Sequence, residues 1–142
     1  MKVETRDFGT IEIDERDVIT FVSPIYGFES YKEFVIINDI SIGTDIMWLQ
    51  SLKDKDVCFV VVSPFAVMKD YNPTISRDDI AKLEAENDES LSYASIAVIP
   101  KELLDATVNL KSPIVINHKN KKAMQLILED EYPIKYKFYK GE

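Results

Sequence analysis

Short runs of apolar residues, separated by polar turns, recur along this chain and predict a protein made mainly of β-strands. Several runs end at a proline, which lacks the amide hydrogen that pairing between strands requires. Polar turns around Gly9 and over the lysine-rich residues 118–122 predict two hairpins. The predicted strands cover residues 3–8, 11–13, 18–22, 34–37, 46–52, 57–63, 91–99, 114–116, 123–128 and 132–139.

One clear helix is predicted to begin after Ser76 and to end near Asn87. The Ser76 hydroxyl can accept a hydrogen bond from an amide of the first turn, and the aspartates at 78–79 complement the positive end of the helix dipole. Leu83 lies on its modest apolar face, and a brief helical turn is expected at residues 102–105. This pattern predicts a mainly β fold, a small antiparallel β-barrel or sandwich-like sheet with one or two short helices.

Length and the absence of a targeting signal narrow the class of protein. A chain of 142 residues can bury a full core, so we expect one domain over residues 1–142. No apolar run approaches the roughly 20 residues that a membrane helix needs, and the charged N-terminus has no signal-peptide pattern. The sequence therefore predicts a cytoplasmic protein that does not enter a membrane.

The charge of the chain is negative and unevenly distributed. The formal net charge is −8, with −11 over residues 1–110 and +3 over residues 111–142. An acidic body argues against direct binding of nucleic acid, because affinity for phosphates depends on cationic side chains. The negative charge has two interpretations: it only keeps a small domain in solution, or it acts on a partner.

Reactive side chains are few. The one cysteine, Cys58, lies in an apolar run and is expected to be a buried, unreactive thiol. The one histidine, His118, lies among lysines and is expected to be an exposed turn residue. Four glycines cannot build a phosphate loop, and the neighbouring carboxylates lack the spacing of a calcium loop. We therefore expect no catalytic residue, no cofactor and no metal site.

Aromatic side chains are the better candidates for function. Trp48 either fills the core or anchors a partner, because large aromatic residues serve both purposes. Alternation along a strand places Trp48 and Gln50 on one side and Leu49 and Ser51 on the other. Further aromatic residues in predicted loops, next to proline or glycine, suggest a protein-binding surface; they are Tyr26, Phe28, Phe65 and Tyr71.

Four short motifs, in this order, resemble those of one bacterial family. They are Pro-Ile-Tyr-Gly-Phe-Glu at residues 24–29 with Phe21 before it, Trp-Leu-Gln-Ser at 48–51, Ser-Pro-Phe at 63–65 with Tyr71 after it, and Thr-Val-Asn-Leu at 107–110 followed by Pro-Ile-Val-Ile-Asn at 113–117. Through them the chain resembles the flagellar assembly factor FliW family over nearly its whole length. Tyr26 departs from the family pattern, in which a small residue or proline precedes the glycine. Ser112 also departs, where alanine is usual.

The resemblance implies a non-enzymatic regulator of flagellar assembly with two protein partners, flagellin and the RNA-binding translational repressor CsrA. Free regulator would bind CsrA and relieve its repression of flagellin messenger RNA, and new flagellin would compete for the regulator. We expect it to be a monomer without its partners. A groove lined by Trp48, Phe28 and Tyr71 is expected to take a flagellin segment. The expected partner-binding residues are Tyr26, Phe28, Trp48, Gln50, Ser51, Tyr71, Asn109 and Asn117.

Two other classes stay open on the residues alone. A small-ligand-binding β-barrel protein would account for the predicted fold and the apolar runs. A carboxylate enzyme would account only for the number of acidic residues. The resemblance ranks the protein-binding regulator first.

Overall fold

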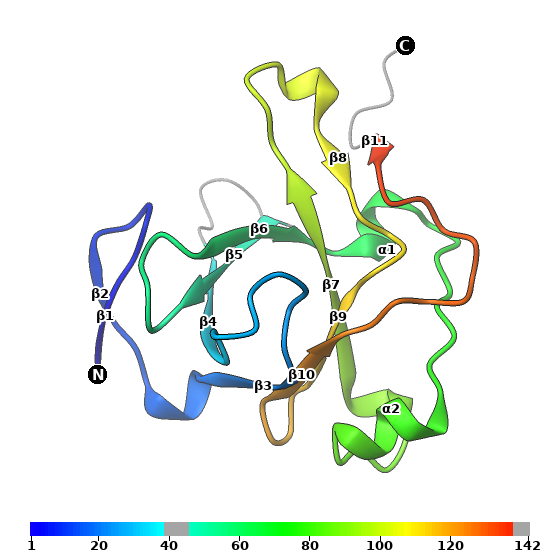
Figure 1. The fold of residues 1–142 in the computed structure, drawn as a ribbon, viewed down its shortest axis with the longest axis horizontal. Coiled ribbons are helices and arrows are strands. Elements are labelled where there is room, and N and C mark those ends of the chain that lie inside the picture. Colours follow the sequence, from blue (N-terminus) through cyan, green and yellow to red (C-terminus); the bar gives the residue numbers. More distant parts are fainter. Residues whose placement is uncertain (39–45, 138–142) are drawn as a thin grey trace.

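Seven β-strands close into a barrel in the structure, a computed structural model that describes residues 1–38 and 46–137 (Figure 1). They are β3 (Ile19–Ser23), β4 (Glu33–Asn38), β5 (Ile46–Ser51), β6 (Cys58–Val62), β7 (Leu91–Val98), β9 (Ile114–Asn117) and β10 (Lys122–Gln125). Their order is β7, β6, β5, β4, β3, β10 and β9, and β9 pairs with β7 to close the circle. Neighbours are antiparallel, except that β3 and β10 are parallel. The predicted mainly β fold is confirmed, and of the two predicted arrangements, a barrel or a sandwich-like sheet, the structure has the barrel.

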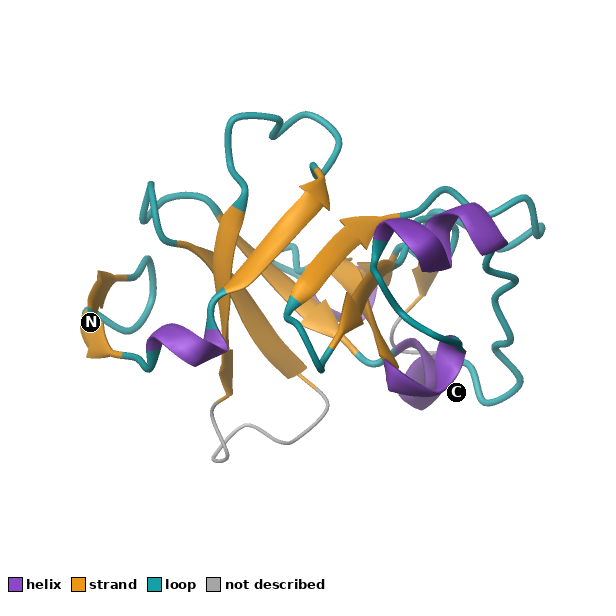
Figure 2. Cartoon of the chain, turned by 90° about the horizontal axis from the view of Figure 1, so that it is seen from below, coloured by secondary structure: helices purple, strands orange, loops and turns teal. Residues whose placement is uncertain are grey.

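Shorter elements surround the barrel. The hairpin of β1 (Lys2–Glu4) and β2 (Thr10–Glu12) lies on one side, with the 3-10 helix η1 (Glu15–Asp17) after it. The helices α1 (Pro64–Val67) and α2 (Arg77–Lys82) lie on the other side (Figures 1 and 2). β7 continues into an arm that pairs with β8 (Thr107–Val108), which in turn pairs with β11 (Tyr136–Lys137). Two more 3-10 helices are η2 (Asp88–Ser90) and η3 (Leu103–Asp105).

The barrel interior is filled by side chains that alternate along the strands. Residues of one strand point in turn to opposite faces, so every second residue of each strand enters the barrel. Phe21 on β3 and Phe34 on β4 meet edge to face, with ring centroids 5.2 Å apart. The buried members of this interior cluster are Ile19, Phe21, Ile25, Phe34, Leu49, Val61, Ala94, Ile114, Ile116 and Ala123.

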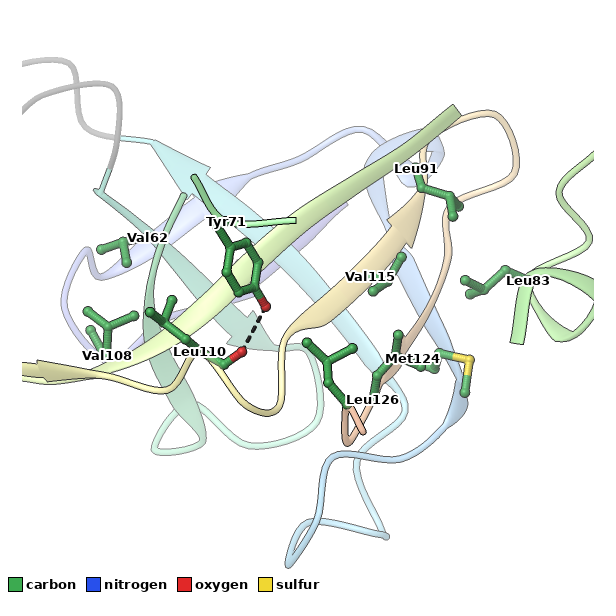
Figure 3. Close-up of a cluster of buried hydrophobic side chains, with 11 residues drawn as sticks. Val62, Tyr71, Leu83, Leu91, Val108, Leu110, Val115, Met124 and Leu126 are labelled. Carbon is green, nitrogen blue, oxygen red and sulfur yellow. Dashed lines mark hydrogen bonds between the residues drawn. The ribbon is translucent and has the colours of Figure 1, made fainter. Parts of the chain in front are cut away.

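A second apolar cluster lies outside the barrel wall (Figure 3). The outward-facing residues of β7, β9 and β10 pack there against the segment that carries α1 and α2 and against the chain after β10. The Tyr71 hydroxyl lies within this cluster and donates a hydrogen bond of 2.8 Å to the carbonyl oxygen of Leu110. The wall shared by the two clusters is therefore buried on both faces, which explains the nearly continuous apolar sequence of β9 (Ile114–Asn117).

The predicted helix begins where expected and ends earlier. The Ser76 hydroxyl accepts a hydrogen bond of 3.1 Å from the Asp79 amide, which confirms the cap. The helix stops at Lys82 and not near Asn87, because Glu84 has a left-handed backbone with φ of 54°. The carbonyl of Leu83 is bound instead by two asparagine side chains of the β9–β10 hairpin. Within the described residues, no helix is long and apolar enough to cross a membrane.

Several predicted strands are shorter in the structure, among them the first, the one over 123–128 and the last. The first strand ends at Glu4, because the Thr5 side chain bonds the Gly9 carbonyl and the Phe8 amide and holds a compact turn. The strand predicted over 123–128 ends at Gln125, although the chain continues along the barrel wall to Leu128. The last predicted strand, 132–139, contains only the two residues of β11, and its residues 138–139 lie outside the described residues.

Candidate protein-binding surface

Four of the eight predicted partner-binding residues are buried, two of them at the end of β5. Gln50 accepts a hydrogen bond of 3.0 Å from the Arg6 amide and donates to the carbonyl oxygens of Ser51 and Lys55. The Ser51 hydroxyl accepts hydrogen bonds from the amides of residues 53–54. Gln50 thus holds the N-terminal hairpin and the β5–β6 turn in place, Ser51 holds the same turn, and neither side chain is exposed.

Tyr71 and Asn117 are the other two buried residues of this set. The hydroxyl of Tyr71 donates its hydrogen bond to the Leu110 carbonyl oxygen, and burial raises the pKa of this phenol. Asn117 donates to the Leu83 carbonyl oxygen at 3.0 Å and accepts from the Lys119 amide at 3.0 Å. In the free protein these polar groups join the α2 segment and the outer cluster to the barrel.

Phe28, Trp48 and Asn109 are half-buried. Phe28 packs against the interior cluster and meets Phe59 edge to face, with centroids 4.9 Å apart. Trp48 meets Phe8 of the N-terminal hairpin, also at 4.9 Å. Asn109 accepts hydrogen bonds from two amides that follow it in the chain. Trp48, Phe28 and Tyr71 therefore have different neighbours, and the structure does not bring them together as walls of one groove.

Tyr26 is the one predicted residue with a largely exposed side chain, at 61%. It lies in the loop between β3 and β4, and its amide donates a hydrogen bond of 3.0 Å to Oε1 of Gln125. The next residue, Gly27, has φ of 86°, a conformation that favours glycine. Ile25 before it is buried in the barrel. The loop is therefore anchored on both sides of Tyr26, whose ring projects outward.

The surroundings of Tyr26 are partly apolar. Tyr26 and Ile127 line the same cavity of about 330 Å³, between the β3–β4 loop, α2 and the end of β10. The Ile127 side chain is 58% exposed, although it follows a buried strand. We call this region the Tyr26 surface; its residues are Pro24, Tyr26, Glu29, Asp79, Lys82, Leu126 and Ile127.

Acidic side chains border the Tyr26 surface. Asp79 lines its cavity and also a neighbouring cavity of about 520 Å³ that contains Glu129 and Asp130. The Asp130 carboxylate is fixed by Thr74, whose hydroxyl donates to it at 3.1 Å. An apolar patch next to a negative border can bind a protein that presents apolar and basic groups together. The sequence alone does not indicate that Ile127 and Asp79 lie next to Tyr26, since its pattern places Ile127 in a strand and Asp79 in the first turn of a helix.

The described residues offer little chemistry of another kind. No group of three or more histidine, cysteine, aspartate or glutamate side chains among them can hold a metal ion. Cys58 is buried as predicted, and burial raises the pKa of its thiol, which the nearby Arg6 opposes only in part. His118 is exposed, also as predicted. The fold and this surface together define a small β-barrel protein with an exposed aromatic side chain on an anchored loop.

Comparisons with known proteins all point to one family. The family model described as FliW protein matches residues 2–138. The chain is 37% identical to the flagellar assembly factor FliW of Caldicellulosiruptor saccharolyticus, covering 98% of this chain and 91% of that protein. It is 38% identical to the FliW of Clostridium kluyveri, covering 100% and 98%. A crystal structure of the flagellar assembly factor FliW has a TM-score of 0.92 at 28% identity, covering 100% and 99% of the two chains. The chain therefore belongs to the FliW family.

Proposed function

We propose that this protein acts in flagellar assembly as a non-enzymatic, cytoplasmic regulator that binds flagellin and CsrA. By binding CsrA it antagonises CsrA repression of flagellin messenger RNA translation, and newly made flagellin competes for it. Membership of the FliW family supports the flagellar role. The observation that carries the binding role is the Tyr26 surface, an exposed aromatic side chain on an anchored loop beside acidic residues.

The acidic border gives the contact with CsrA a physical basis. CsrA must hold polyanionic RNA on a basic surface, because binding of phosphates depends on cationic side chains. The acidic border of the Tyr26 surface consists of Asp79, which also lines the Tyr26 cavity, and of Glu129 and Asp130 in the neighbouring cavity. Docking of this border close to the RNA path would weaken RNA binding by repulsion, over a range of about 8 Å at physiological salt. The contact therefore needs no overlap with the RNA site itself.

Flagellin is proposed to bind mainly through apolar contacts. A segment of flagellin that is disordered before assembly can fold as an amphipathic helix when it docks on an apolar surface. Tyr26 and Ile127 supply exposed apolar area on the same cavity. If both partners use this area, flagellin and CsrA exclude each other, which produces the competition that the regulatory loop requires.

The experiment is a titration of the pure protein with flagellin and with CsrA, first separately and then together. The proposal predicts a saturable complex with each protein at micromolar concentration or below, and loss of the CsrA complex as flagellin is added. Absence of binding to both proteins would contradict the proposed function. A stable complex of all three would contradict the shared surface and leave the two binding activities standing.

A further inference from the structure

A cavity of about 630 Å³ lies at one end of the barrel, where β4 and β9 end and β3, β5 and β7 begin. Its wall continues the barrel interior, since inward-facing residues of these strands line it. Ile11 of β2 and Ile13 just after β2 add two more isoleucines. Pockets of this size at the mouth of a β-barrel are a common place for small-molecule sites. The long apolar side chains of the wall include Ile11, Ile13, Ile19, Ile36, Met47 and Ile116.

Three polar groups line one side of this barrel-mouth cavity. Oγ of Ser92 and Nε2 of His118 lie 3.1 Å apart, and both residues border the cavity together with Lys121. The backbone of Lys121 is held in place, because its amide bonds the Asn117 carbonyl and its carbonyl accepts from the Thr20 amide. Among the described residues, no ion pair involves Lys121. A hydroxyl, an imidazole and a lysine side chain without an ion pair in the described part of the chain thus belong to residues that border the same apolar space.

The carboxylates that line the cavity are mostly compensated. Asp14 is bound by the Arg16 guanidinium at 2.7 Å, and Glu12 by the α-ammonium group of Met1 at 3.2 Å. Asp17 is the remaining acidic residue of the lining. Lys121, which has no ion pair among the described residues, thus offers one cationic partner to a ligand with a single negative charge and too little positive charge for a polyanion such as a nucleotide.

We propose that the barrel-mouth cavity binds a small monocarboxylate with a medium-length alkyl chain. The alkyl chain of the ligand lies against the isoleucine wall, and its carboxylate accepts hydrogen bonds from Lys121 and from the Ser92–His118 pair. Burial of the alkyl chain provides most of the affinity, and the charged head group fixes the orientation of the ligand. This site lies apart from the Tyr26 surface, whose lining residues it does not share, so it goes beyond the proposed function.

The test compares octanoate, octanol and octylamine, which share one chain length and differ in head group. Calorimetric titration is expected to give tightest binding for octanoate. With isoleucine methyl groups labelled for NMR, octanoate is expected to shift the resonances of Ile11, Ile36 and Ile116 and to leave those of the exposed Ile127 and Ile134 unchanged. Equal affinity for octanol, absence of binding at millimolar octanoate, or equal shifts at Ile127 would overturn the proposal.

Matched variants locate the head group. Lys121→Gln is expected to weaken octanoate binding about fivefold and to leave octanol binding unchanged, because only the carboxylate loses a partner. Lys119→Gln is the control, since Lys119 lies on the same hairpin turn and does not line this cavity. Ser92→Ala provides a second variant, with a smaller loss for octanoate alone. Identical octanoate affinity in Lys121→Gln and Lys119→Gln would contradict the assigned orientation.

Discussion

The amide of Tyr26 donates a hydrogen bond to Oε1 of Gln125, a residue 99 positions later in the chain, at 3.0 Å. Nε2 of the same glutamine donates to the Ser112 carbonyl oxygen at 3.2 Å. One side chain of β10 therefore ties the exposed β3–β4 loop to the segment that precedes β9. This link restrains the loop that carries Tyr26. A restrained loop loses less entropy when a partner binds than a loop that moves freely.

Replacement of Gln125 by methionine keeps the volume of the side chain and removes both hydrogen bonds. We expect the free energy of unfolding to fall by about 1–3 kcal/mol, since the Tyr26 amide and the Ser112 carbonyl lose their partners. Urea denaturation measures this loss, and hydrogen exchange measures its local effect. The Tyr26 amide should exchange at least about tenfold faster, a change that follows from a local opening about 1.4 kcal/mol easier. Unchanged exchange at Tyr26 would contradict the anchoring role.

Tyr71→Phe removes only the hydroxyl that binds the Leu110 carbonyl oxygen. We expect a loss of about 1 kcal/mol in the free energy of unfolding at neutral pH, as for a typical buried hydrogen bond. The replacement also changes the pH dependence. Burial raises the pKa of the Tyr71 phenol in the folded state, so stability is fully present below about pH 10 and is lost as pH rises above that value.

The measurement is urea denaturation of both proteins between pH 8 and pH 11, values chosen around the phenol pKa of about 10. Wild type should lose stability more steeply than Tyr71→Phe over the upper part of this range. Tyr26→Phe is the control, because the Tyr26 ring is exposed. Parallel curves for wild type and Tyr71→Phe would contradict the effect of burial on this group.

The mainly β fold could be predicted from the sequence, because alternation and strand-stopping prolines are local signals. They do not decide between a barrel and a sandwich-like sheet, since the β7–β9 pairing that closes the barrel joins distant segments. The Ser76 cap, the burial of Cys58 and the exposure of His118 follow from local sequence in the same way. The early end of α2 could not, since it depends on Asn117 and Asn120, which bind the Leu83 carbonyl from 34 and 37 positions away.

The candidate site was harder to predict for a related reason. Gln50, Tyr71 and Asn117 are polar residues with partners 44, 39 and 34 positions distant, so in the sequence they resemble surface residues. Their burial becomes visible only when the closed barrel brings those partners close. Ile127 has the opposite property: an apolar residue in a strand-like run that the structure leaves exposed. Partner-binding roles for all eight residues stay predictions.

Charge neutralisation beside the Tyr26 surface tests the repulsion of RNA. The double variant Asp79→Asn, Glu129→Gln is expected to displace RNA from CsrA less effectively than wild type while it still binds CsrA. The matched control is the double variant Glu4→Gln, Glu15→Gln. It also removes two negative charges, but from β1 and η1 on the N-terminal side of the molecule (Figure 1). Gel-shift titration of a CsrA–RNA complex measures displacement. Equal displacement by the two double variants would remove the local electrostatic account.

The most direct measurement of the central claim is the affinity of Tyr26→Ala for flagellin and for CsrA. Exposed aromatic anchors commonly contribute about 2 kcal/mol or more, so we expect each affinity to fall by about thirtyfold or more. Leu104→Ala is the control, since Leu104 is 66% exposed and lies on the β7–β8 arm, outside the Tyr26 surface. Its affinities should equal those of wild type. A folded Tyr26→Ala protein that binds both partners with wild-type affinity would contradict the assignment of this surface.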